Sequence, residues 1–119
     1  MKTILFIDTT TNKTIKVGLN KNGKEFIIEQ QLDKQKAQIV LPLIDKLLKK
    51  NNLTLKDISA IHINPGPGSF TGIRVGLTIA NTLAFLLKIS VNDKPIGDFV
   101  EPVYTYLVMS TRQVRGDTV

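Results

Sequence analysis

Short apolar and alternating runs of strand length occupy the first quarter of the chain. Thr3–Ile7 is a short apolar run, which predicts a central strand buried on both faces. In Thr14–Leu19 apolar and polar residues alternate, which predicts a half-buried strand, and Glu25–Leu32 forms a third strand after the turn signal Asn22-Gly23. Because short turns join the three strands, the sequence predicts an antiparallel meander.

Two later stretches have helical spacing. Lys36–Lys50 places apolar residues three and four positions apart, and Pro42 inside it predicts a bend or a break. After a predicted strand at Asp57–Ile63, the stretch Gly72–Leu87 is apolar nearly all round, which predicts a helix buried on more than one side. Its smallest residues recur every four positions, so they form a ridge that another backbone can approach closely: Gly72, Gly76, Ala80 and Ala84. A meander followed by helix, strand and helix predicts an α/β fold.

The segment between the last predicted strand and the second helix is rich in glycine and proline. Asn64–Gly72 contains Gly66, Gly68 and Gly72 with two prolines, which predicts a tight, shaped turn. Ser69 and Thr71 precede the apolar run and can cap the N-terminus of the helix.

Composition narrows the class of protein. A chain of 119 residues with 42% hydrophobic residues has the length and apolar content of one globular domain. It contains no cysteine, which excludes disulfides and thiolate metal sites, and we expect a cytoplasmic protein. The uncharged run Val75–Leu87 is too short to cross a bilayer, so no membrane segment is expected. Lysines cluster around Lys36–Lys50, so the net charge of +6 is interpreted as a solvated helix face in preference to a nucleic-acid patch.

Two stretches contain residues that could contact phosphate or another anion. Asp8-Thr9-Thr10 follows the first strand, where a carboxylate could hold a hydrated metal, although a polar strand-to-turn junction is the favoured interpretation. The glycine-rich turn could present backbone N–H groups, but no Walker lysine follows it, which favours a structural turn. The candidate anion contacts are Asp8, Thr9, Thr10, Gly66, Gly68 and Ser69. His62 is the single histidine, and neither a metal site nor a catalytic residue is predicted.

Three stretches resemble the bacterial TsaB family: IDTTTNKTIKVGL, IVLPLIDKLLKKNNLTLKDISAI and, most specifically, PGPGSFTGIRVGLTIANTLAF. The resemblance extends from Met1 to about Ile89. It implies a single ribonuclease-H-like lobe of the actin and Hsp70 type, with a mixed sheet and two main helices. It also implies a non-catalytic subunit that binds the paralogue TsaD in the formation of threonylcarbamoyladenosine on tRNA.

The same resemblance implies an interface. The helices at Lys36–Lys50 and Gly72–Leu87 are expected to pack against the equivalent helices of a TsaD-type partner or of a second copy. Contact with TsaE is expected only through that complex, and contact with tRNA only indirectly. Arg74 lies in the first turn of its helix, where the helix dipole disfavours a cation, so we expect it to pair with Asp8 or a partner carboxylate, or to extend into solvent. The expected partner contacts are Ile39, Leu43, Leu47, Arg74, Leu77, Ala80, Leu83 and Ala84.

The chain departs from the family after its second helix, where family members continue into a second lobe. Residues 97–109 instead resemble the family's C-terminal segment, so we expect one lobe over residues 1–109 and a mobile tail over 110–119. Without a second lobe no cofactor is expected, and ATP or ADP with Mg²⁺ is restricted to a partner interface. The alternative function is a stand-alone nucleotide- or anion-binding half-domain that uses Asp8, Thr10 and the glycine-rich turn.

Overall fold

The structure is a computed structural model that describes residues 2–31 and 36–103, with side chains omitted at 36 and 37. The expected tail at 110–119, the predicted strand end at Leu32 and residues 104–109 of the expected lobe lie outside the described residues. The elements, in chain order, are β1 (Thr3–Asp8), β2 (Thr14–Lys21), β3 (Lys24–Gln31), α1 (Lys36–Lys50), the 3₁₀ helix η1 (Leu55–Asp57), β4 (Ala60–Ile63), α2 (Phe70–Leu87) and β5 (Ser90–Val91).

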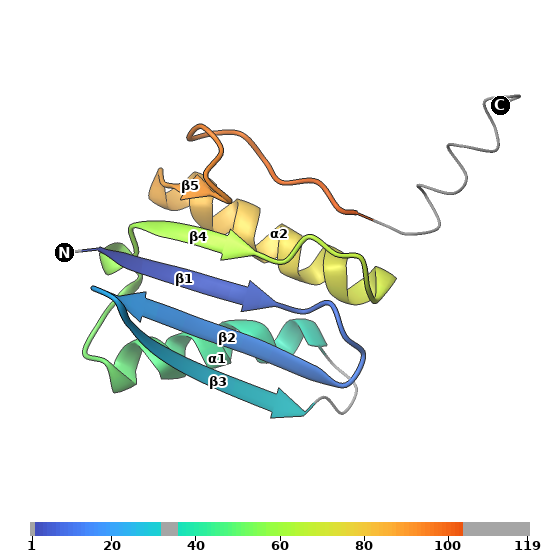
Figure 1. Cartoon of the computed structure of the whole chain (residues 1–119), viewed down its shortest axis with the longest axis horizontal. Helices are drawn as coiled ribbons and strands as arrows, with labels where there is room; N and C mark the ends of the chain where they lie inside the picture. The colour runs from blue at the N-terminus through green and yellow to red at the C-terminus, as the bar shows by residue number, and fades with distance from the viewer. Residues whose placement is uncertain (1, 32–35, 104–119) are drawn as a thin grey trace, which may run out of the picture.

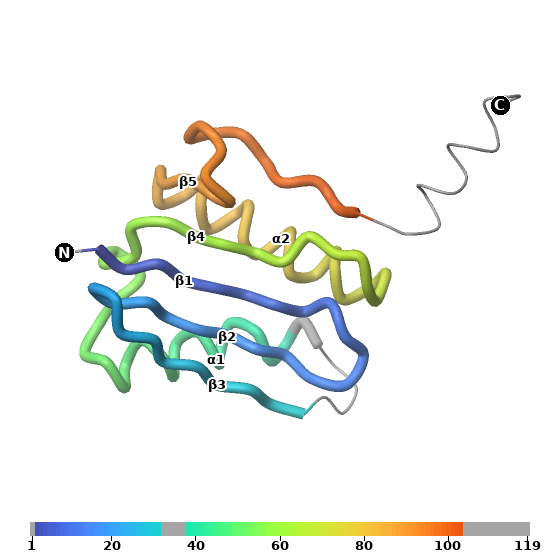
Figure 2. The backbone as a smooth tube through the Cα atoms, viewed as in Figure 1, coloured from blue at the N-terminus to red at the C-terminus, as the bar shows by residue number. Residues whose placement is uncertain are grey.

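Five strands form one mixed sheet in the order β3-β2-β1-β4-β5 (Figure 1). β1, β2 and β3 pair antiparallel, which confirms the predicted meander, whereas β4 runs parallel to both β1 and β5. The tube in Figure 2 shows β1 and β4 side by side, although a whole helix separates them in sequence. This parallel return through α1 makes the fold α/β, as predicted.

The β2–β3 hairpin follows directly from its turn residues. Asn22 and Gly23 have φ angles of 53° and 91°, and both values lie in the left-handed region that a two-residue turn requires. The Asn20 side chain accepts a hydrogen bond from the Gly23 N–H at 2.9 Å. The turn fixes the register, in which Lys21 faces Lys24 and Val17 faces Ile28.

The prediction that β1 is buried on both faces is wrong. Leu5 and Ile7 point towards the helices and are fully buried, but Ile4 and Phe6 are only partly buried. Figure 1 shows both helices behind the sheet and no helix in front of it among the described residues. We call this front surface the open face; it carries Ile4, Phe6, Gly18, Ile27 and His62.

α1 runs unbroken through Pro42, so the predicted break is absent. Pro42 is exposed, whereas Val40, Leu43 and Ile44 are buried against the sheet, and this packing outweighs the hydrogen bond that proline cannot donate. The helix ends as predicted, since Asn52 follows it with φ at 58°.

The fourth strand starts later than predicted, at Ala60. Residues 55–57 form η1 instead, because Thr54 and Asp57 make a capping box: the Thr54 N–H donates to Asp57 Oδ2 at 2.7 Å.

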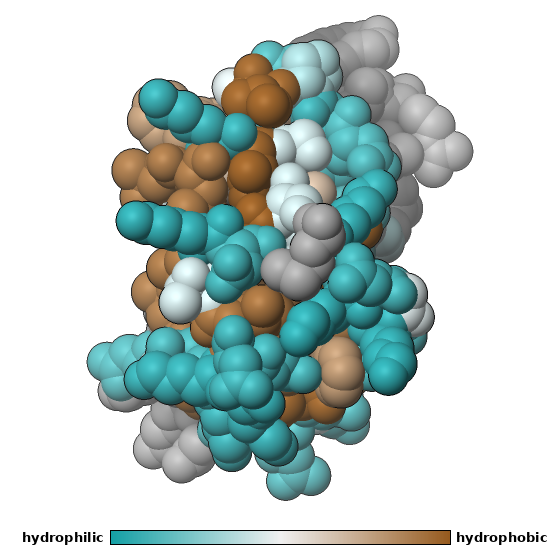
Figure 3. Space-filling view, turned by 90° about the vertical axis from the view of Figure 1, so that its left-hand side faces the viewer, coloured by the Kyte–Doolittle hydropathy of each residue, from teal (hydrophilic) through white to brown (hydrophobic). Residues whose placement is uncertain are grey.

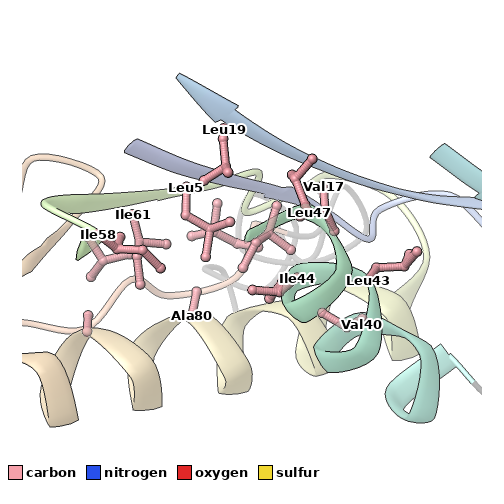
Figure 4. Packing of buried hydrophobic residues seen from close by; sticks show 14 of the residues in the cluster. Leu5, Val17, Leu19, Val40, Leu43, Ile44, Leu47, Ile58, Ile61 and Ala80 are labelled. Carbon is pink, nitrogen blue, oxygen red and sulfur yellow. The ribbon is translucent and has the colours of Figure 1, made fainter. Parts of the chain in front are cut away.

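The core lies between the buried face of the sheet and the two helices. Figure 4 shows Leu5, Val17 and Leu19 of the sheet above Ile44 and Leu47 of α1, with Ala80 of α2 below. All of these side chains are at most 2% exposed, so the buried cluster is continuous from β2 to α2.

α2 begins at Phe70, two residues before the predicted start. The Ser69 hydroxyl accepts a hydrogen bond from the Gly72 N–H at 3.1 Å, which confirms Ser69 as the cap. At the other end Lys88 adopts φ 57°, and its N–H reaches the carbonyls of Ala84 and Phe85. Hydrogen bonds between neighbouring residues therefore define both ends of the helix.

Candidate functional site

The loop after β1 and the glycine-rich turn after β4 meet at the carboxyl ends of the two parallel strands. The Asn64 N–H donates to the Ile7 carbonyl at 3.0 Å, and the Asn64 side chain donates to Asp8 Oδ2 at 3.2 Å. Asp8 Oδ1 accepts from both the N–H of Thr10, at 2.9 Å, and its hydroxyl, at 2.7 Å. Both carboxylate oxygens of Asp8 are thus satisfied within the chain.

These contacts set the charge of Asp8. Burial by itself would raise its pKa, but the hydrogen bonds from Thr10 and Asn64, with the positive charge of Lys16 nearby, lower the pKa below its ordinary value. Asp8 is therefore an anion at neutral pH, and a carboxylate at this position disfavours a second anion beside it.

The glycine-rich turn is packed against the β1 loop. The Ser69 N–H donates to the Thr10 carbonyl at 2.6 Å, and the Gly66 N–H donates to Asn64 Oδ1 at 3.1 Å. A Cβ at Gly68 would overlap the backbone of Thr10, so this position requires glycine for packing. The N–H groups of Gly66 and Ser69 are thus used inside the chain, and the hydroxyl of Thr9 donates to the Gly72 carbonyl at 2.6 Å.

No group of three or more His, Asp or Glu side chains that could hold a metal occurs in the described ranges 2–31 and 36–103. His62 lies on the open face, where its Nε2 is 3.5 Å from Asp93 Oδ1, an exposed carboxylate. One imidazole and one exposed carboxylate do not make a transition-metal site.

The small ridge of α2 faces the chain's own sheet. The Thr9 side chain lies directly against Gly76, where a Cβ would overlap its hydroxyl, and Ile63 packs beside it. The expected close approach of a backbone is present, but the approaching element is the end of β1 and not a partner.

This placement corrects five of the eight expected partner contacts. Their side chains lie in the chain's own core with at most 5% of their surface exposed: Leu43, Leu47, Leu77, Ala80 and Ala84. Ile39 and Leu83 are partly buried against that core, and Arg74 alone of the eight is exposed. α2 packs against both the sheet and α1, as expected for a helix buried on more than one side, and one of its faces stays exposed among the described residues.

The outward surface of α2 is apolar with a single charge. We call it the outer face of α2; it forms a shallow hollow of about 360 Å³ lined by Thr71, Arg74, Val75, Thr78 and Ile79. The Arg74 guanidinium lies 5.2 Å from the centre of the Phe70 ring, a cation–π contact on the surface. The two ion pairs among the described residues, Lys49–Asp45 and His62–Asp93, do not involve Arg74, so the expected pairing with Asp8 is absent.

A second apolar surface lies at the C-terminal end of α2. Phe85, Leu86, Ile96 and Phe99 are each more than half exposed, and the rings of Phe85 and Phe99 meet edge to face at 6.5 Å. Figure 3, which looks at this end of the molecule, shows hydrophobic atoms gathered between polar side chains. The segment after β5 is fixed here by Asn81, whose side chain donates to the Val100 carbonyl at 3.0 Å and accepts from its N–H at 2.9 Å.

Sequence reasoning missed Val75, Thr78 and Ile79 on the outer face. They recur at helical spacing, as the small ridge does, but a helix that is apolar all round does not reveal which side meets the sheet. α2 is long and apolar enough to cross a membrane by length and composition alone. Its small residues pack against a sheet, as expected for the core helix of a globular lobe, and core helices of soluble proteins meet the same criterion.

Comparison with known families identifies the group to which the fold belongs. Residues 25–92 match the family model described as TsaD, tRNA N6-adenosine threonylcarbamoyltransferase. The chain is also 39% identical over 83 residues to the tRNA threonylcarbamoyladenosine biosynthesis protein TsaB of Haemophilus influenzae, covering 70% of this chain and 35% of that protein. It is 37% identical over 93 residues to TsaB of Bacillus subtilis, covering 76% of this chain and 39% of that protein.

The chain belongs to the TsaB family. It spans between a third and two fifths of the length of these two TsaB relatives. Among solved structures, the TsaB-family chain resembles YeaZ from Pseudomonas aeruginosa with a TM-score of 0.72 at 28% identity, covering 98% of this chain and 50% of that one. These matches confirm the predicted single ribonuclease-H-like lobe.

Proposed function

We propose that this chain is a non-catalytic docking subunit in the biosynthesis of threonylcarbamoyladenosine on tRNA, and that it binds a TsaD-type partner through the outer face of α2. The names of its relatives and of the matching family model support the pathway. The outer face supports the role, because it has an exposed Thr78 between the partly buried side chains Val75 and Ile79, an uncharged surface that the chain covers only in part.

The observation that carries the proposal is the charge pattern of α2. From Val75 to Leu87 the helix has no charged residue, although Thr78, Thr82, Phe85 and Leu86 are exposed to solvent. An exposed helix face normally carries charged or strongly polar residues, so this one has the composition of a surface that a second protein covers. A stable interface of ordinary size buries roughly 800 Å² on each partner, which is more than the hollow alone provides. The adjacent surface around Phe85 and Leu86 extends the same helix face.

Arg74 supplies a positive charge at one end of the proposed interface. It lies at the N-terminal end of the outer face and has no carboxylate partner among the described residues, so the TsaD-type partner supplies an acidic side chain opposite it. TsaE and tRNA enter only through the assembled complex, and ATP or ADP with Mg²⁺ binds only where the partner completes a site. We place this assembly in the cytoplasm, and a second copy of the chain is the alternative occupant of the outer face.

The alternative function, a stand-alone nucleotide or anion site, gains no support from the geometry. Asp8 is anionic, and the N–H groups of Gly66 and Ser69 already donate to groups of the chain. A phosphate held by the N–H groups of Gly66 and Ser69 would therefore replace two internal hydrogen bonds and lie near an anionic Asp8.

The test introduces a charge on the outer face. Thr78→Glu places an exposed carboxylate in the hollow without disturbing the core, and Gln30→Glu on the edge strand β3 is the matched control. We expect Thr78→Glu to weaken binding to a purified TsaD-type partner by about 100-fold or more. The new carboxylate lies one helical turn from Arg74, so it adds a charge that the interface must desolvate and it opposes the acidic side chain that the partner presents to Arg74. Calorimetric titration of each variant, with circular dichroism to confirm the fold, measures this. Wild-type affinity in Thr78→Glu would refute the proposal.

Light scattering shows whether a TsaD-type partner or a second copy of the chain occupies the outer face. A mass that doubles for the chain alone, and does not rise when the TsaD-type partner is added, would assign the outer face to a second copy. A mixed complex of one chain with one partner supports the proposal as stated.

A further inference from the structure

Lysines from several separate segments gather at the end of the lobe where β1 begins. The Lys2 carbonyl accepts a hydrogen bond from the Asn22 N–H at 3.0 Å, and the Lys2 N–H donates to Asn22 Oδ1 at 3.0 Å. The start of the chain is thereby joined to the β2–β3 turn. Figure 1 shows this turn, the start of β1 and the connection from α1 to β4 at the same end of the molecule. We call the lysine side chains there the basic end: Lys2, Lys21, Lys24, Lys50 and Lys56.

A second pair of hydrogen bonds fixes the connection from α1 beside β1. The Ser59 N–H donates to the Thr3 carbonyl at 2.7 Å, and the Thr3 N–H donates to Ser59 Oγ at 3.1 Å. Lys56 belongs to η1, which ends two residues before Ser59, and Lys50 is the last residue of α1. The fold thus brings together lysines that are distant in sequence.

The lysines of the basic end have no carboxylate partner among the described residues. Neither of the two ion pairs there involves any of them, and all except the partly buried Lys21 are exposed. In the hairpin register Lys21 lies directly opposite Lys24, and like charges in opposite positions destabilise a strand pair. The chain therefore keeps a repulsive pair at this end without an internal anion to offset it.

Ordinary structural reasons account for only part of the basic end. A lysine on the edge strand β3 hinders unwanted strand pairing, which suits Lys24, and a cation at the end of α1 favours the helix dipole, which suits Lys50. The interpretation of the net charge as a solvated helix face also applies to Lys50 alone, because the other four lysines lie outside α1. The opposed pair of Lys21 and Lys24 is left without such a reason.

The surface between the lysines favours a nucleic acid over a membrane as the anionic partner. It contains four exposed polar residues: Asn22, Asn52, Thr54 and Ser59. Lysine, asparagine, serine and threonine side chains are common contacts of the phosphate and sugar oxygens of nucleic acids. Surfaces that bind anionic lipids place several large apolar side chains among their lysines, whereas here Leu55, which is 41% exposed, stands among polar residues.

We propose that the basic end contacts the phosphate backbone of tRNA directly. The choice of tRNA among polyanions rests on the proposed function, since the names of the relatives place them in a tRNA modification pathway. None of the residues that line the outer face of α2 belongs to the basic end. A TsaD-type partner and a tRNA can therefore occupy the chain together, and in the assembled complex the tRNA touches this chain as well as the partner.

Lys24→Glu tests the proposal, because it changes folding and binding in opposite directions. A carboxylate opposite Lys21 replaces a repulsion with an attraction, so urea denaturation should show a stability at least equal to that of the wild type. Binding of the full chain to a fluorescently labelled, unmodified tRNA transcript should weaken about tenfold, measured by fluorescence anisotropy. The slope of log affinity against log salt concentration should become shallower by about one.

The matched control is Lys13→Glu, which makes the same change in net charge. Lys13 is exposed in the loop between β1 and β2, at the opposite end of the lobe (Figure 1). In about 0.1 M salt the Debye length is about 10 Å, so a distant charge is screened and Lys13→Glu should keep the wild-type affinity for tRNA. Equal weakening in both variants, wild-type affinity in Lys24→Glu, or no binding by the wild type would each overturn the proposal.

Two further measurements identify the partner. Tighter binding to vesicles of phosphatidylcholine and phosphatidylserine than to tRNA, weakened by Lys24→Glu, would assign the basic end to a membrane and overturn the proposal. Calorimetric titration with the TsaD-type partner should give the wild-type affinity for Lys24→Glu. Because tRNA binding is measured on the chain alone and docking on Thr78→Glu, failure of this inference and failure of the proposed function are distinguishable.

Discussion

A glycine-to-alanine change at Gly68 tests whether the glycine-rich turn serves packing. The turn is joined to the β1 loop by the hydrogen bond from the Ser69 N–H to the Thr10 carbonyl, at 2.6 Å. The Cβ of Gly68→Ala would overlap that same carbonyl, and the obstacle is backbone, which cannot rotate away as a side chain can. The turn and the loop must therefore separate.

The magnitude follows from three contributions. Forcing extra volume into a packed site costs about 1–3 kcal/mol. Weakening the Ser69–Thr10 hydrogen bond costs about 1 kcal/mol. Alanine lowers the conformational entropy of the unfolded chain, which offsets this loss of stability by about 0.4–1 kcal/mol. We expect a net loss of about 1–3.6 kcal/mol, which for a domain of this size lowers the Tm by roughly 4–14 °C.

Gly18→Ala is the matched control, because its Cβ would make only ordinary contacts at 3.4 Å or more. It should leave stability unchanged or slightly raised, since alanine suits a strand better than glycine does. Urea denaturation followed by circular dichroism, with no ligand present, measures both variants. If Gly68→Ala is as stable as Gly18→Ala, the packing role assigned to the turn is wrong.

Three further changes test individual contacts. Asn81→Leu removes both hydrogen bonds to Val100 and should speed amide exchange of that residue at least tenfold, measured by hydrogen exchange. Thr9→Val keeps the shape but loses the bond to the Gly72 carbonyl, and urea titration should show a loss of about 1 kcal/mol. The folded-state pKa of Asp8 is lowered, so its contribution to stability is present above the ordinary aspartate value, near 4, and is lost as the pH falls through the lower folded value. Stability measured between neutral and acid pH should therefore fall less steeply in Asp8→Asn; an unchanged slope would contradict the hydrogen-bonded carboxylate.

Local chemistry made parts of the fold predictable. Asn22-Gly23 allowed only one kind of turn between two alternating runs, and Ser69 stood where the cap of an apolar helix is needed. Both signals act within a few residues, so neighbouring sequence is sufficient to identify them. The start of β4 was missed because the capping box of Thr54 and Asp57 competes with strand formation over the same residues.

Whether a given face of a strand or helix is buried depends on contacts between residues that are distant in sequence. The apolar run Thr3–Ile7 suits a strand covered on one face or on two, and the described structure covers only one. The site after β1 combines Asp8 with Asn64, and the sequence predicted the first without the second, because an asparagine before a proline is an ordinary turn residue. For α2, the position of Thr9 against Gly76 decides which side is buried.

That contact also changes the expected form of the docking surface. Because Gly76 and Ala80 face the sheet, the outer face of α2 presents the larger side chains Val75 and Ile79. A partner helix then meets interlocking side chains at the ordinary axial separation of about 8–10 Å, and not the close backbone contact that a small ridge would allow. A charge at Ala80 would enter the fully buried core and unfold the chain, so loss of binding in such a variant would say nothing about docking. Only substitutions on the outer face, such as Thr78→Glu, separate the interface from the fold.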